Sequence, residues 1–523
     1  MGRYLNTDSC FKNYQKLYNN RYFVDKSLII EHLNDRIGTN SQYICITRPR
    51  RFGKTSIAEM LGAYYCKAVD SKEIFDTLKI KNANSYDEYL NKCNIIKISF
   101  NERPDNNLNN YEKYINRIKS ILTKDIMQAY PHLKNNNYED NNLSDLLMDT
   151  GDEFIFILDE WDYIFSINQF KENQPDFLSF LMNLLKDKPY VALCYMTGVL
   201  PIKKYSDTSE LNMFNEFNFL KDRIFGKYFG FTEDEVKVLC DKNQNISFNE
   251  LEDWYNGYST ANDIKLYNPR SVISALENNY CESYWTNTGS MNGVLEYLKY
   301  NILDVRDDVI KMVSGEEIEI NIDEEFRAGQ NQPKTRQEIY SAMIVLGFLS
   351  YSDGYLKIPN KELMKEFEKA LKDDSFGVVS KIVNDSKKLL DATINCDAQM
   401  VEALLHNIHN SEIPILQYND ENSLACVVNI AYLSARDYYR IEREEKTGKG
   451  YADFMFHPKR KNRTGIIIEL KKNDSVDAAI AQIKGKEYAQ KLRSEDNCIK
   501  ILAVAICYDS KIKEHHCKIE ELN

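Results

Sequence analysis

The stretch that decides the fold of the N-terminal half is ICITRPRRFGKTS, residues 44–56. Its apolar beginning predicts a buried β-strand over residues 43–47. A short loop follows, and apolar residues then recur at helical spacing between residues 57 and 64, which predicts a helix. A loop between a strand and a helix points backbone N–H groups and the helix N-terminus at phosphates. The stretch therefore predicts a P-loop nucleotide site.

The loop differs from the usual P-loop pattern GxxxxGK[ST] at one position. Lys54 and Thr55 fit the pattern, in which the lysine contacts the β- and γ-phosphates and the hydroxyl binds Mg²⁺. Arg48 stands where the first glycine is usual. This arginine, Arg50 and Arg51 could each stabilise phosphate charge, face a neighbouring subunit of a homo-oligomer, or be solvated or ion-paired. The expected cofactors are ATP and Mg²⁺. The residues expected to bind them from the loop are Arg51, Phe52, Gly53, Lys54, Thr55 and Ser56.

A second stretch, FIFILDEWD at residues 154–162, predicts an apolar strand that ends in two adjacent carboxylates. Such a strand can bring Asp159 into the Mg²⁺ shell and Glu160 to the attacking water as its catalytic base. The strand that ends at Thr197 would offer a hydroxyl near the γ-phosphate. The alternative is that the two carboxylates simply end a buried strand at its solvated edge.

The remaining pattern predicts an α/β fold with a parallel sheet for residues 1–230. Apolar strands at residues 43–47, 95–100, 154–158 and 191–196 alternate there with helical segments. The pattern over residues 231–384 predicts a helical lid followed by a winged-helix-like middle region. The pattern over residues 385–523 predicts a second α/β domain.

Within the middle region, a helix is expected over residues 336–346 and a hairpin over residues 348–358, with its turn at Asp353-Gly354. Such a unit could bind duplex DNA or pack against other domains, and its lack of basic residues favours packing. The earlier aromatic group of Trp254, Tyr255 and Tyr258 is expected in the core, with base stacking as the alternative.

The chemistry of the last domain lies in GYADFMF, residues 450–456, and GIIIELKK, residues 465–472. Opposing positions of a β-hairpin converge, and alternate residues of one strand share a face. Asp453, Glu469 and Lys471 are therefore expected in one pocket. Two carboxylates and a lysine can hold a divalent metal and help to form hydroxide for phosphodiester cleavage. The alternative is an ordinary amphipathic hairpin with a Glu–Lys ion pair.

Composition limits the function classes that remain. The chain has 523 residues, enough for roughly three domains, and a net charge of −12. This charge excludes a protein that coats nucleic acid by bulk electrostatics, so any DNA or RNA site must be a local basic patch. No apolar run is long enough for a membrane span. The 12 cysteines lack CxxC spacing and are expected to be reduced, which favours a cytoplasmic protein.

The N-terminal motifs resemble one known family. The segments YFVDKSLIIEHL, ITRPRRFGKTS, ILDEWD and TGVLPI, followed by WYNGY and YNP, are similar to the AAA-ATPase-like family common in bacteria. That family shares the missing first glycine, and its members are often fused to a C-terminal PD-(D/E)XK nuclease domain. The resemblance covers about 270 residues and implies an AAA-like ATPase fold. It gives no chemical role to Asp25 and Lys26.

The last 130 or so residues resemble the PD-(D/E)XK nuclease superfamily through EKTGKGYADFMF, GIIIELKK and AAIAQIKGKEYAQKL. The resemblance implies a restriction-endonuclease-like fold in which Asp453 and Glu469 bind Mg²⁺ and Lys471 positions or activates the water. Glu444 matches an upstream acidic metal position. Gln482, together with Tyr488, matches a QxxxY-like element. One departure is Tyr451, because relatives usually carry an arginine two residues before the first metal carboxylate.

These observations together predict an ATP-binding and ATP-hydrolysing protein with a Mg²⁺-dependent nuclease domain that cleaves DNA or RNA. Two alternatives stay open at this point. The nuclease-like domain could bind without cleaving, as part of a nucleotide-gated signalling or interaction module. The N-terminal site could also be purely structural and bind no nucleotide.

Overall fold

The computed structural model describes residues 2–102, 110–135, 143–202, 211–285, 305–322, 326–327, 333, 335–373, 378–409, 421–447, 450–485, 488–494 and 498–522. The chain forms two compact units. Unit 1 comprises Met1–Ser290 and Glu319–Leu363, and unit 2 comprises Met291–Ile318 and Met364–Asn523. Each unit is described by itself.

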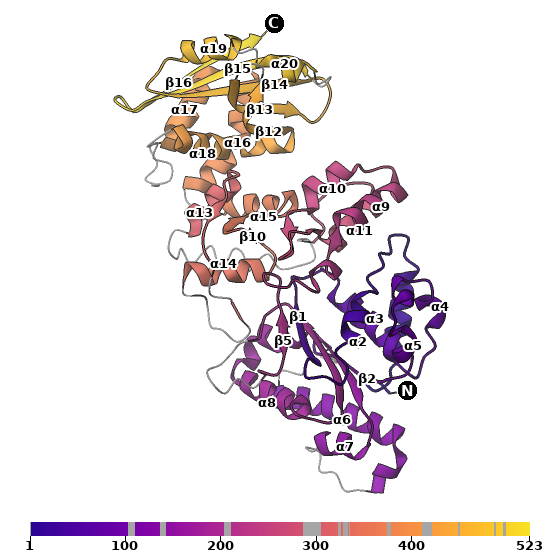
Figure 1. Ribbon diagram of the computed structural model, residues 1–523. Helices are drawn as coiled ribbons and strands as arrows, with labels where there is room; N and C mark the ends of the chain where they lie inside the picture. Colours follow the sequence, from indigo (N-terminus) through magenta and orange to yellow (C-terminus); the bar gives the residue numbers. More distant parts are fainter. Residues whose placement is uncertain are drawn as a thin grey trace. The chain divides into compact units, whose positions relative to one another are not determined.

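Unit 1 is built on a parallel five-stranded sheet in the order β2-β3-β4-β1-β5 (Figure 1). The strands are β1 (Tyr43–Thr47), β2 (Asn94–Ser99), β3 (Phe154–Asp159), β4 (Val191–Gly198) and β5 (Asn215–Phe217). Every residue of β1, β3 and β4 is buried, as expected of parallel strands covered on both faces. The predicted α/β class is confirmed.

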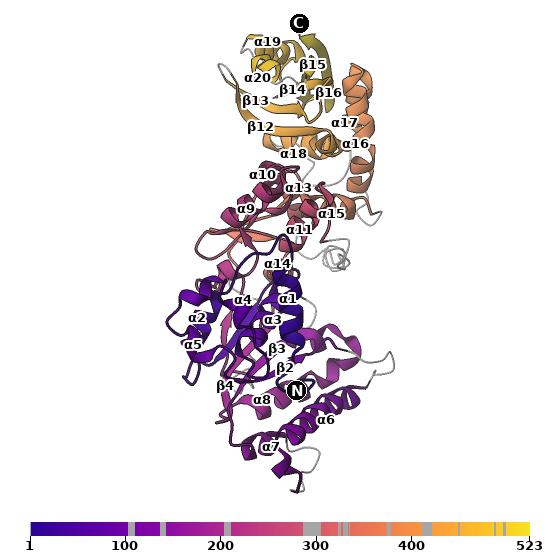
Figure 2. The same cartoon turned by 90° about the vertical axis from the view of Figure 1, so that its right-hand side faces the viewer.

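Two apolar clusters cover the faces of this sheet. Alternate strand residues such as Ile44, Ile46 and Ile157 pack on one side, and Cys45 and Phe156 pack on the other. The first cluster includes α1 (Ser9–Tyr18), α2 (Ile29–Asn34) and α3 (Lys54–Tyr65), and the second includes α6 (Tyr111–Ala129), α7 (Leu143–Asp149) and α8 (Gln174–Leu185). Figure 2 shows this arrangement from the side. Short helices α4 (Lys72–Phe75) and α5 (Tyr86–Tyr89) complete the layer on the α3 side.

A small helical subdomain follows the sheet and is called the lid below. It consists of α9 (Glu233–Asn243), α10 (Phe248–Tyr255) and α11 (Pro269–Asn278), with a short sheet β6 (Phe231–Thr232), β8 (Lys265–Tyr267) and β7 (Tyr258–Ser259). Helices α9 and α10 begin at capping boxes, in which Thr232 and Ser247 satisfy free backbone N–H groups. The aromatic group of residues 254, 255 and 258 is buried, which confirms the core interpretation.

The expected helix and hairpin of the middle region are also confirmed. Helix α14 (Arg336–Val345) is followed by β10 (Ser350–Ser352) and β11 (Tyr355–Lys357), which pair antiparallel. Asp353 and Gly354 both have positive φ, at 52° and 86°, as a two-residue hairpin turn requires. Helix α15 (Lys361–Leu371) follows the hairpin, and β9 (Ile318–Glu319) precedes α14.

Unit 2 contains a mixed five-stranded sheet in the order β12-β13-β14-β15-β16. Its strands are β12 (Tyr439–Thr447), β13 (Gly450–Pro458), β14 (Arg463–Lys472), β15 (Cys498–Asp509) and β16 (Glu514–Leu522). Only β14 and β15 are parallel, because α19 (Val476–Gly485) and α20 (Ala489–Ser494) cross between them. In the described part of this unit, the further α-helices are α13 (Val305–Val313), most of α15 (Lys361–Leu371), α16 (Val378–Ile394), α17 (Ala398–His409) and α18 (Glu421–Ala431).

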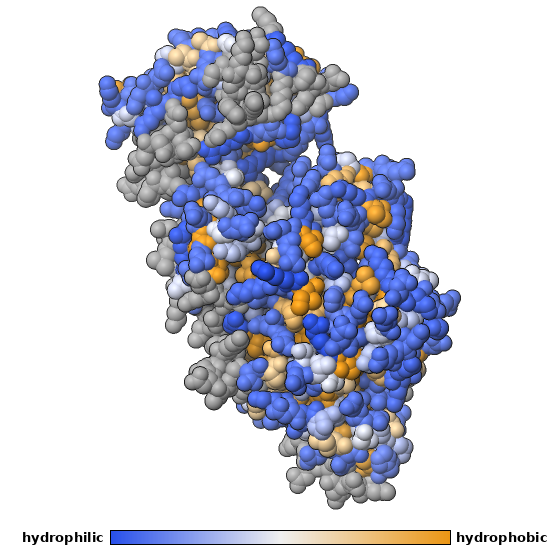
Figure 3. All heavy atoms as spheres, in the orientation of Figure 1, coloured by the Kyte–Doolittle hydropathy of each residue, from blue (hydrophilic) through white to orange (hydrophobic). Residues whose placement is uncertain are grey.

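The surface, the helices and the cysteines add three observations. The face seen in Figure 3 is mainly hydrophilic, with small and separate apolar patches. In the described part of the chain, no helix has the length and apolar character needed to cross a bilayer. All 12 cysteines lie among the described residues, and all are free thiols.

Candidate functional site

The loop between β1 and α3 adopts a conformation that only certain residues allow. Gly53 lies directly before α3 and has φ 86°, in the left-handed region where glycine carries no steric cost. Arg51 also has positive φ, at 70°. These two residues turn the chain so that α3 starts at Lys54 and directs its free N–H groups towards the loop.

Lys54 folds back over this loop. Its side chain is buried, and Nζ donates to the carbonyl oxygens of Arg48 and Pro49, both at 2.9 Å. Burial lowers the pKa of Lys54 to about 8, and the nearby Asp162, Asp159 and Glu160 carboxylates oppose that shift. The lysine is therefore held by weak neutral acceptors among acidic neighbours, and an anionic phosphate can draw it away.

Arg48, the residue at the first glycine position, points into the protein and not towards the lysine. Its guanidinium is 1% exposed and forms an ion pair with the equally buried Asp222. It also donates to the carbonyls of Thr47 at 2.7 Å and Phe217 at 2.8 Å, and it lies 5.1 Å from the ring centre of Phe229. Of the three loop arginines, Arg48 is thus a buried structural anchor.

Two of the predicted metal ligands meet at the carboxyl ends of the strands. Asp159 ends β3, and its carboxylate is almost fully buried. Burial raises the pKa of Asp159, while a hydrogen bond from the Thr55 hydroxyl and the charges of Lys97 and Lys54 lower it. Thr55 and Asp159 are therefore already adjacent. A hydroxyl and a carboxylate in this arrangement fit a Mg²⁺ ion.

Glu160 follows Asp159 and stands in the left-handed region, with φ 52°. This turn places the side chain on the wall of the cavity described below. Burial raises the pKa of Glu160, and the neighbouring Asp159 charge raises it further. A carboxylate with a raised pKa on the wall of a polar cavity is a suitable proton acceptor.

The other two predicted nucleotide residues are placed differently. Thr197 is fully buried, and its hydroxyl donates to the carbonyl of Ile46 on β1 at 2.9 Å. It lies level with Asp159 in the sheet, but it is not among the residues that line the cavity. The ring of Phe52 packs edge-on against Phe219 and Tyr258, at 5.7 and 5.1 Å between centres. Its side chain anchors the loop, and Phe52 lines the smaller apolar pocket described below, not the cavity beside the loop.

A cavity of about 800 Å³ opens next to the loop. Arg50, Arg51 and Lys54 line it from the loop, and Glu160 and Asp162 line it from the end of β3. Its volume suits a nucleotide, since small-molecule sites in proteins span some 300–1,000 Å³. Among the described residues, the lining consists of Arg50, Arg51, Gly53, Lys54, Thr55, Ser56, Asn101, Glu160, Asp162, Tyr163, Ser166, Val199, Leu200, Pro269, Arg270, Ile273, Trp285 and Leu346.

Several of these lining residues were missed by the sequence analysis, among them Arg270, Trp285 and Asp162. Arg270 lines the cavity from the start of α11, and the Tyr-Asn-Pro motif just before it was the available signal. Trp285 carried no signal. Asp162 accepts hydrogen bonds from the backbone N–H groups of Val199 at 3.0 Å and Leu200 at 2.8 Å. It thereby joins the end of β3 to the end of β4.

A smaller apolar pocket of about 120 Å³ adjoins this cavity and shares Gly53 and Ile273 with it. Tyr22, Phe23 and Val24 of the YFVDKS motif line it. A flat aromatic group of a ligand in the larger cavity could enter here. This placement gives the motif a role as the apolar wall beside the P-loop.

The other half of that motif is structural. Lys26 forms a 2.6 Å ion pair with Glu235 of α9 and donates to the carbonyl of Lys227. Asp25 accepts from the backbone N–H groups of Ser27 and Lys79, both at 2.8 Å. Lys26 thus ties the N-terminal segment to the lid, and Asp25 ties it to the segment at Lys79.

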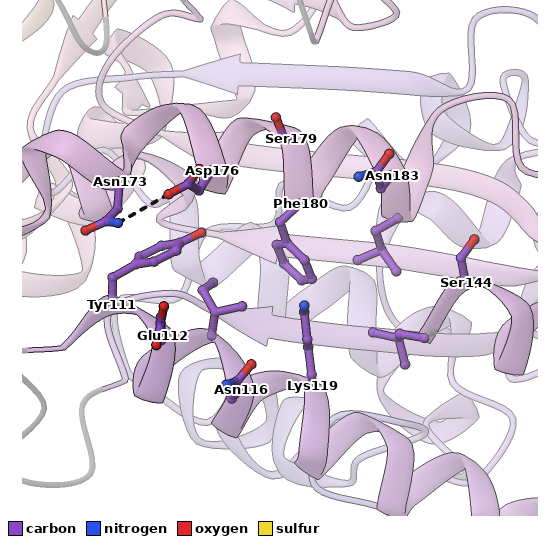
Figure 4. Close-up of a pocket in the computed structure, with 13 residues that line it drawn as sticks. Tyr111, Glu112, Asn116, Lys119, Ser144, Asn173, Asp176, Ser179, Phe180 and Asn183 are labelled. Atoms are coloured by element: carbon purple, nitrogen blue, oxygen red, sulfur yellow. Dashed lines mark hydrogen bonds between the residues drawn. The ribbon is translucent and has the colours of Figure 1, made fainter. Parts of the chain in front are cut away.

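Another hollow of unit 1 provides a contrast (Figure 4). It measures about 420 Å³ and lies between α6, α7 and α8. Lys119 points towards Phe180, with Nζ 5.6 Å from the ring centre, while Glu112 and Asp176 bring two carboxylates. A triphosphate would meet net negative charge there, whereas the P-loop cavity offers four cationic side chains. The P-loop cavity is the better nucleotide site.

In unit 2, the predicted nuclease residues converge on one face of the sheet. The β13–β14 register pairs Phe454 with Ile468, so Asp453 lies opposite Glu469 one position further on. An oxygen of Asp453 accepts from the backbone N–H of Leu470 at 2.7 Å. Lys471 Nζ lies 3.0 Å from Glu469 Oε1, and this pair shares a face because the strand period is two.

Gln482 reaches the same group from α19, where its side-chain amide donates to Glu469 Oε1. Glu469 is 2% exposed, so it is a buried carboxylate held by an ammonium and an amide. Tyr488, the other residue of the QxxxY-like element, is fully buried in the apolar core that α19 forms with the sheet of unit 2. The chemistry of the set, two carboxylates at opposing strand positions with a lysine beside them, fits a divalent metal.

Other parts of the predicted constellation cannot be placed. Glu444 lies on β12 and Tyr451 on β13, but their side chains are outside the described part of the chain. Within the described residues, no group of three or more His, Cys, Asp or Glu side chains is close enough to hold a metal. The candidate metal site of unit 2 therefore rests on Asp453 and Glu469.

Comparisons with known proteins match both regions. Residues 10–208 match the family model described as predicted AAA-ATPase, and residues 419–516 match that of the PD-(D/E)XK nuclease superfamily. The first range contains the P-loop and Asp159, and the second contains Asp453, Glu469, Lys471 and Gln482. No curated protein sequence matches the chain.

Solved structures give weaker similarities. A Walker-type ATPase of Pyrococcus abyssi is 13% identical, with a TM-score of 0.34, over 67% of this chain and 99% of that one. The ORC2 protein of Aeropyrum pernix in ADPNP–ADP complexes is 11% identical, with a TM-score of 0.29, over 70% and 94%. The ORC1 protein of the same organism in complex with DNA is 12% identical, with a TM-score of 0.24, over 69% and 96%. These values are too low to assign a shared function.

Proposed function

We propose that this chain, which joins a domain of the predicted AAA-ATPase family to a domain of the PD-(D/E)XK nuclease superfamily, is an ATP-controlled nuclease. Unit 1 binds and hydrolyses ATP, and unit 2 cleaves DNA or RNA phosphodiesters in a reaction that depends on Mg²⁺. The observation that carries the proposal is the meeting of Asp453, Glu469, Lys471 and Gln482 on one face of the C-terminal sheet.

On the nucleotide side, Lys54 is the residue that leaves its two carbonyl partners and contacts the β- and γ-phosphates. Thr55 and Asp159 would hold Mg²⁺, which supplies charge neutralisation when it is bound. Glu160 accepts a proton from the attacking water, a role that its raised pKa supports. Arg50, Arg51 and Arg270 add positive charge around the phosphates.

The apolar pocket next to the cavity takes the base of the nucleotide. Phe23 and Val24 offer apolar contacts at a site that also shares the P-loop glycine. The triphosphate would then occupy the P-loop cavity, and the base would occupy the adjoining apolar pocket.

On the nuclease side, Asp453 and Glu469 would hold the metal, which polarises the scissile phosphate when it is bound. Lys471, beside Glu469, orients the attacking water or holds its proton. Gln482 keeps the Glu469 carboxylate in place from α19. Nucleic acid must approach through a local patch, because the whole chain is acidic.

The test is Mg²⁺-dependent degradation of labelled single- and double-stranded DNA and RNA by the purified full-length chain. We expect Lys471→Ala to lower the cleavage rate at least about 100-fold, the typical contribution of such a group. Lys472→Ala is the matched control, because Lys472 neighbours Lys471 but points to the other face of the strand. It should stay within about twofold of the wild-type rate.

Two outcomes would contradict the proposal. Cleavage that survives in Lys471→Ala would remove the assigned site. Absence of cleavage on every substrate, with and without ATP, would favour the alternative of a nucleotide-gated module that binds without cutting.

A further inference from the structure

The nucleotide cavity is closed by residues that lie outside the range matched by the ATPase family model. Arg270 comes from the start of α11, Trp285 from the segment after it, and Leu346 from the end of α14. All three lie beyond residue 208, where that match ends. The lid and the helix–hairpin unit, residues 335–363, therefore both contribute walls to the same cavity.

A single buried carboxylate joins these walls. Glu362, in the first turn of α15, is 1% exposed. One of its oxygens accepts the Ser271 hydroxyl at 2.8 Å, and the other accepts the backbone N–H of Trp285 at 2.7 Å. Ser271 is the neighbour of Arg270. These two hydrogen bonds thus end at Trp285, which lines the cavity, and at Ser271, the neighbour of a residue that lines it.

Burial of a carboxylate costs free energy unless hydrogen-bond donors satisfy its oxygens. The two hydrogen bonds to Glu362 are therefore strong contacts for Ser271 and Trp285. Loss of the Ser271 bond would remove one of the contacts that hold the turn that carries Arg270, and would leave the Asn268 cap on that turn. Loss of the Trp285 bond would remove the backbone anchor of the indole on the cavity wall and leave its stacking contact with Phe348, at 6.1 Å between ring centres. The position of both cavity-lining side chains therefore depends on Glu362.

The helix–hairpin unit also touches the P-loop directly. Gly347, just past α14, has φ 86°, and a Cβ there would lie 2.7 Å from the Pro49 side chain and 3.2 Å from Trp285. Its carbonyl accepts the Tyr258 hydroxyl at 2.7 Å. Pro49 is also one of the two carbonyl partners of Lys54. If Lys54 releases the Pro49 carbonyl, Pro49 can move, and it packs tightly against Gly347. The release of Lys54 therefore acts on the contact between the loop and the helix–hairpin unit.

We propose that Glu362 is a positioning residue of the nucleotide site, and that through it the helix–hairpin unit responds to nucleotide occupancy. The proposal rests on the proposed ATP site. A triphosphate attracts Lys54 away from the Pro49 carbonyl and attracts Arg270 towards the phosphates. Both movements reach the helix–hairpin unit, the first through Gly347 and the second through Ser271 and Glu362. This unit is then a nucleotide sensor and not an independent reader of duplex DNA.

The test measures ATP binding and hydrogen exchange of the full-length chain with and without Mg²⁺ and ATP. In the wild type, ATP should slow exchange in α14 and the β10–β11 hairpin about tenfold. In Glu362→Gln, ATP should still bind, about tenfold more weakly, and the slowing should fall below about twofold. Ser271→Ala is a milder variant that removes only one donor and should give an intermediate result.

One control variant and one further measurement distinguish a positioning role of Glu362 from a general loss of stability. Glu366→Gln makes the same change one turn further along α15 and should behave as the wild type. The ATP-induced rise in Tm should shrink in Glu362→Gln, whereas a purely structural role would lower Tm equally with and without ATP.

The possible results are distinguishable. If Glu362→Gln and Ser271→Ala bind ATP like the wild type and show the same slowing in α14, the inference is wrong while the ATP site stands. If Lys54→Ala and the wild type bind labelled ATP equally, or neither binds it, the proposed ATP site and this inference both fall.

Discussion

The Arg48 guanidinium forms an ion pair with the Asp222 carboxylate, and each side chain is only 1% exposed. Arg48 occupies the position of the first P-loop glycine, so glycine there would match the usual pattern better. We nevertheless expect Arg48→Gly to destabilise the fold by about 3 to 5 kcal/mol, because it leaves the Asp222 charge buried without its partner. Urea unfolding of both proteins measures this difference in free energy.

Arg50→Gly provides the matched control, since Arg50 is exposed in the same loop, and it should cost about 1 kcal/mol or less. In the Arg48→Gly background, Asp222→Asn should recover part of the loss by removing the unpaired charge. Additive effects of the two substitutions would show that the pair is not coupled, and would contradict this account.

A second prediction concerns the pH dependence of ATP binding. Burial lowers the pKa of Lys54 to about 8 without nucleotide, and a bound triphosphate must raise it. Affinity is then fully present below the lower pKa, about 8, and is lost as pH rises through and beyond it. Calorimetric titrations from about pH 7 to about pH 9.5 should show affinity falling up to tenfold per pH unit above that value, with proton uptake on binding.

The control for this dependence is Lys54→Arg, because a guanidinium stays protonated over the whole range. Its weaker affinity should be nearly independent of pH. A wild-type affinity that stays constant up to about pH 9.5 would mean that Lys54 does not contact the phosphates.

A third prediction concerns Gln482 in unit 2. Its amide donates to the same Glu469 oxygen that Lys471 contacts, so Gln482→Ala should leave the carboxylate poorly oriented for a metal. Loss of such a supporting bond typically costs 10- to 100-fold in metal affinity or activity, and we expect about this shift in the Mg²⁺ concentration needed for half-maximal cleavage.

Gln490→Ala, an exposed glutamine on the next helix, should leave that Mg²⁺ requirement within about twofold of the wild type. If Gln482→Ala lowered the rate at saturating Mg²⁺ but left the half-maximal concentration unchanged, Gln482 would act on substrate and not on the metal ligand.

Much of the fold could be predicted from the sequence because local patterns determine it. The four apolar strands of the first sheet stand where their hydrophobic runs predict them, and Asp353-Gly354 forms the hairpin turn that its backbone preference favours. The convergence of Glu469 and Lys471 followed from the strand period alone. The domain boundaries stay a prediction.

Other features depended on contacts between distant segments, which one sequence does not reveal. The partner of Arg48 is 174 residues away, and that of Lys26 is 209 residues away. Thr197 turns its hydroxyl to Ile46, because the neighbouring strand offers a carbonyl there. Glu362 stands 91 residues from Ser271, and neither residue belongs to a recognisable motif. Pairings of this kind appear only once the chain is folded.

The central claim, that a nucleotide in unit 1 controls cleavage by unit 2, is tested most directly by one measurement. The Mg²⁺-dependent cleavage rate is determined with and without ATP for the wild type and for Lys54→Ala, with Lys471→Ala as the inactive reference. We predict that ATP changes the rate of the wild type and leaves that of Lys54→Ala unaltered, while Lys471→Ala still binds ATP but does not cleave. A wild-type cleavage rate that is the same with and without ATP would contradict the claim.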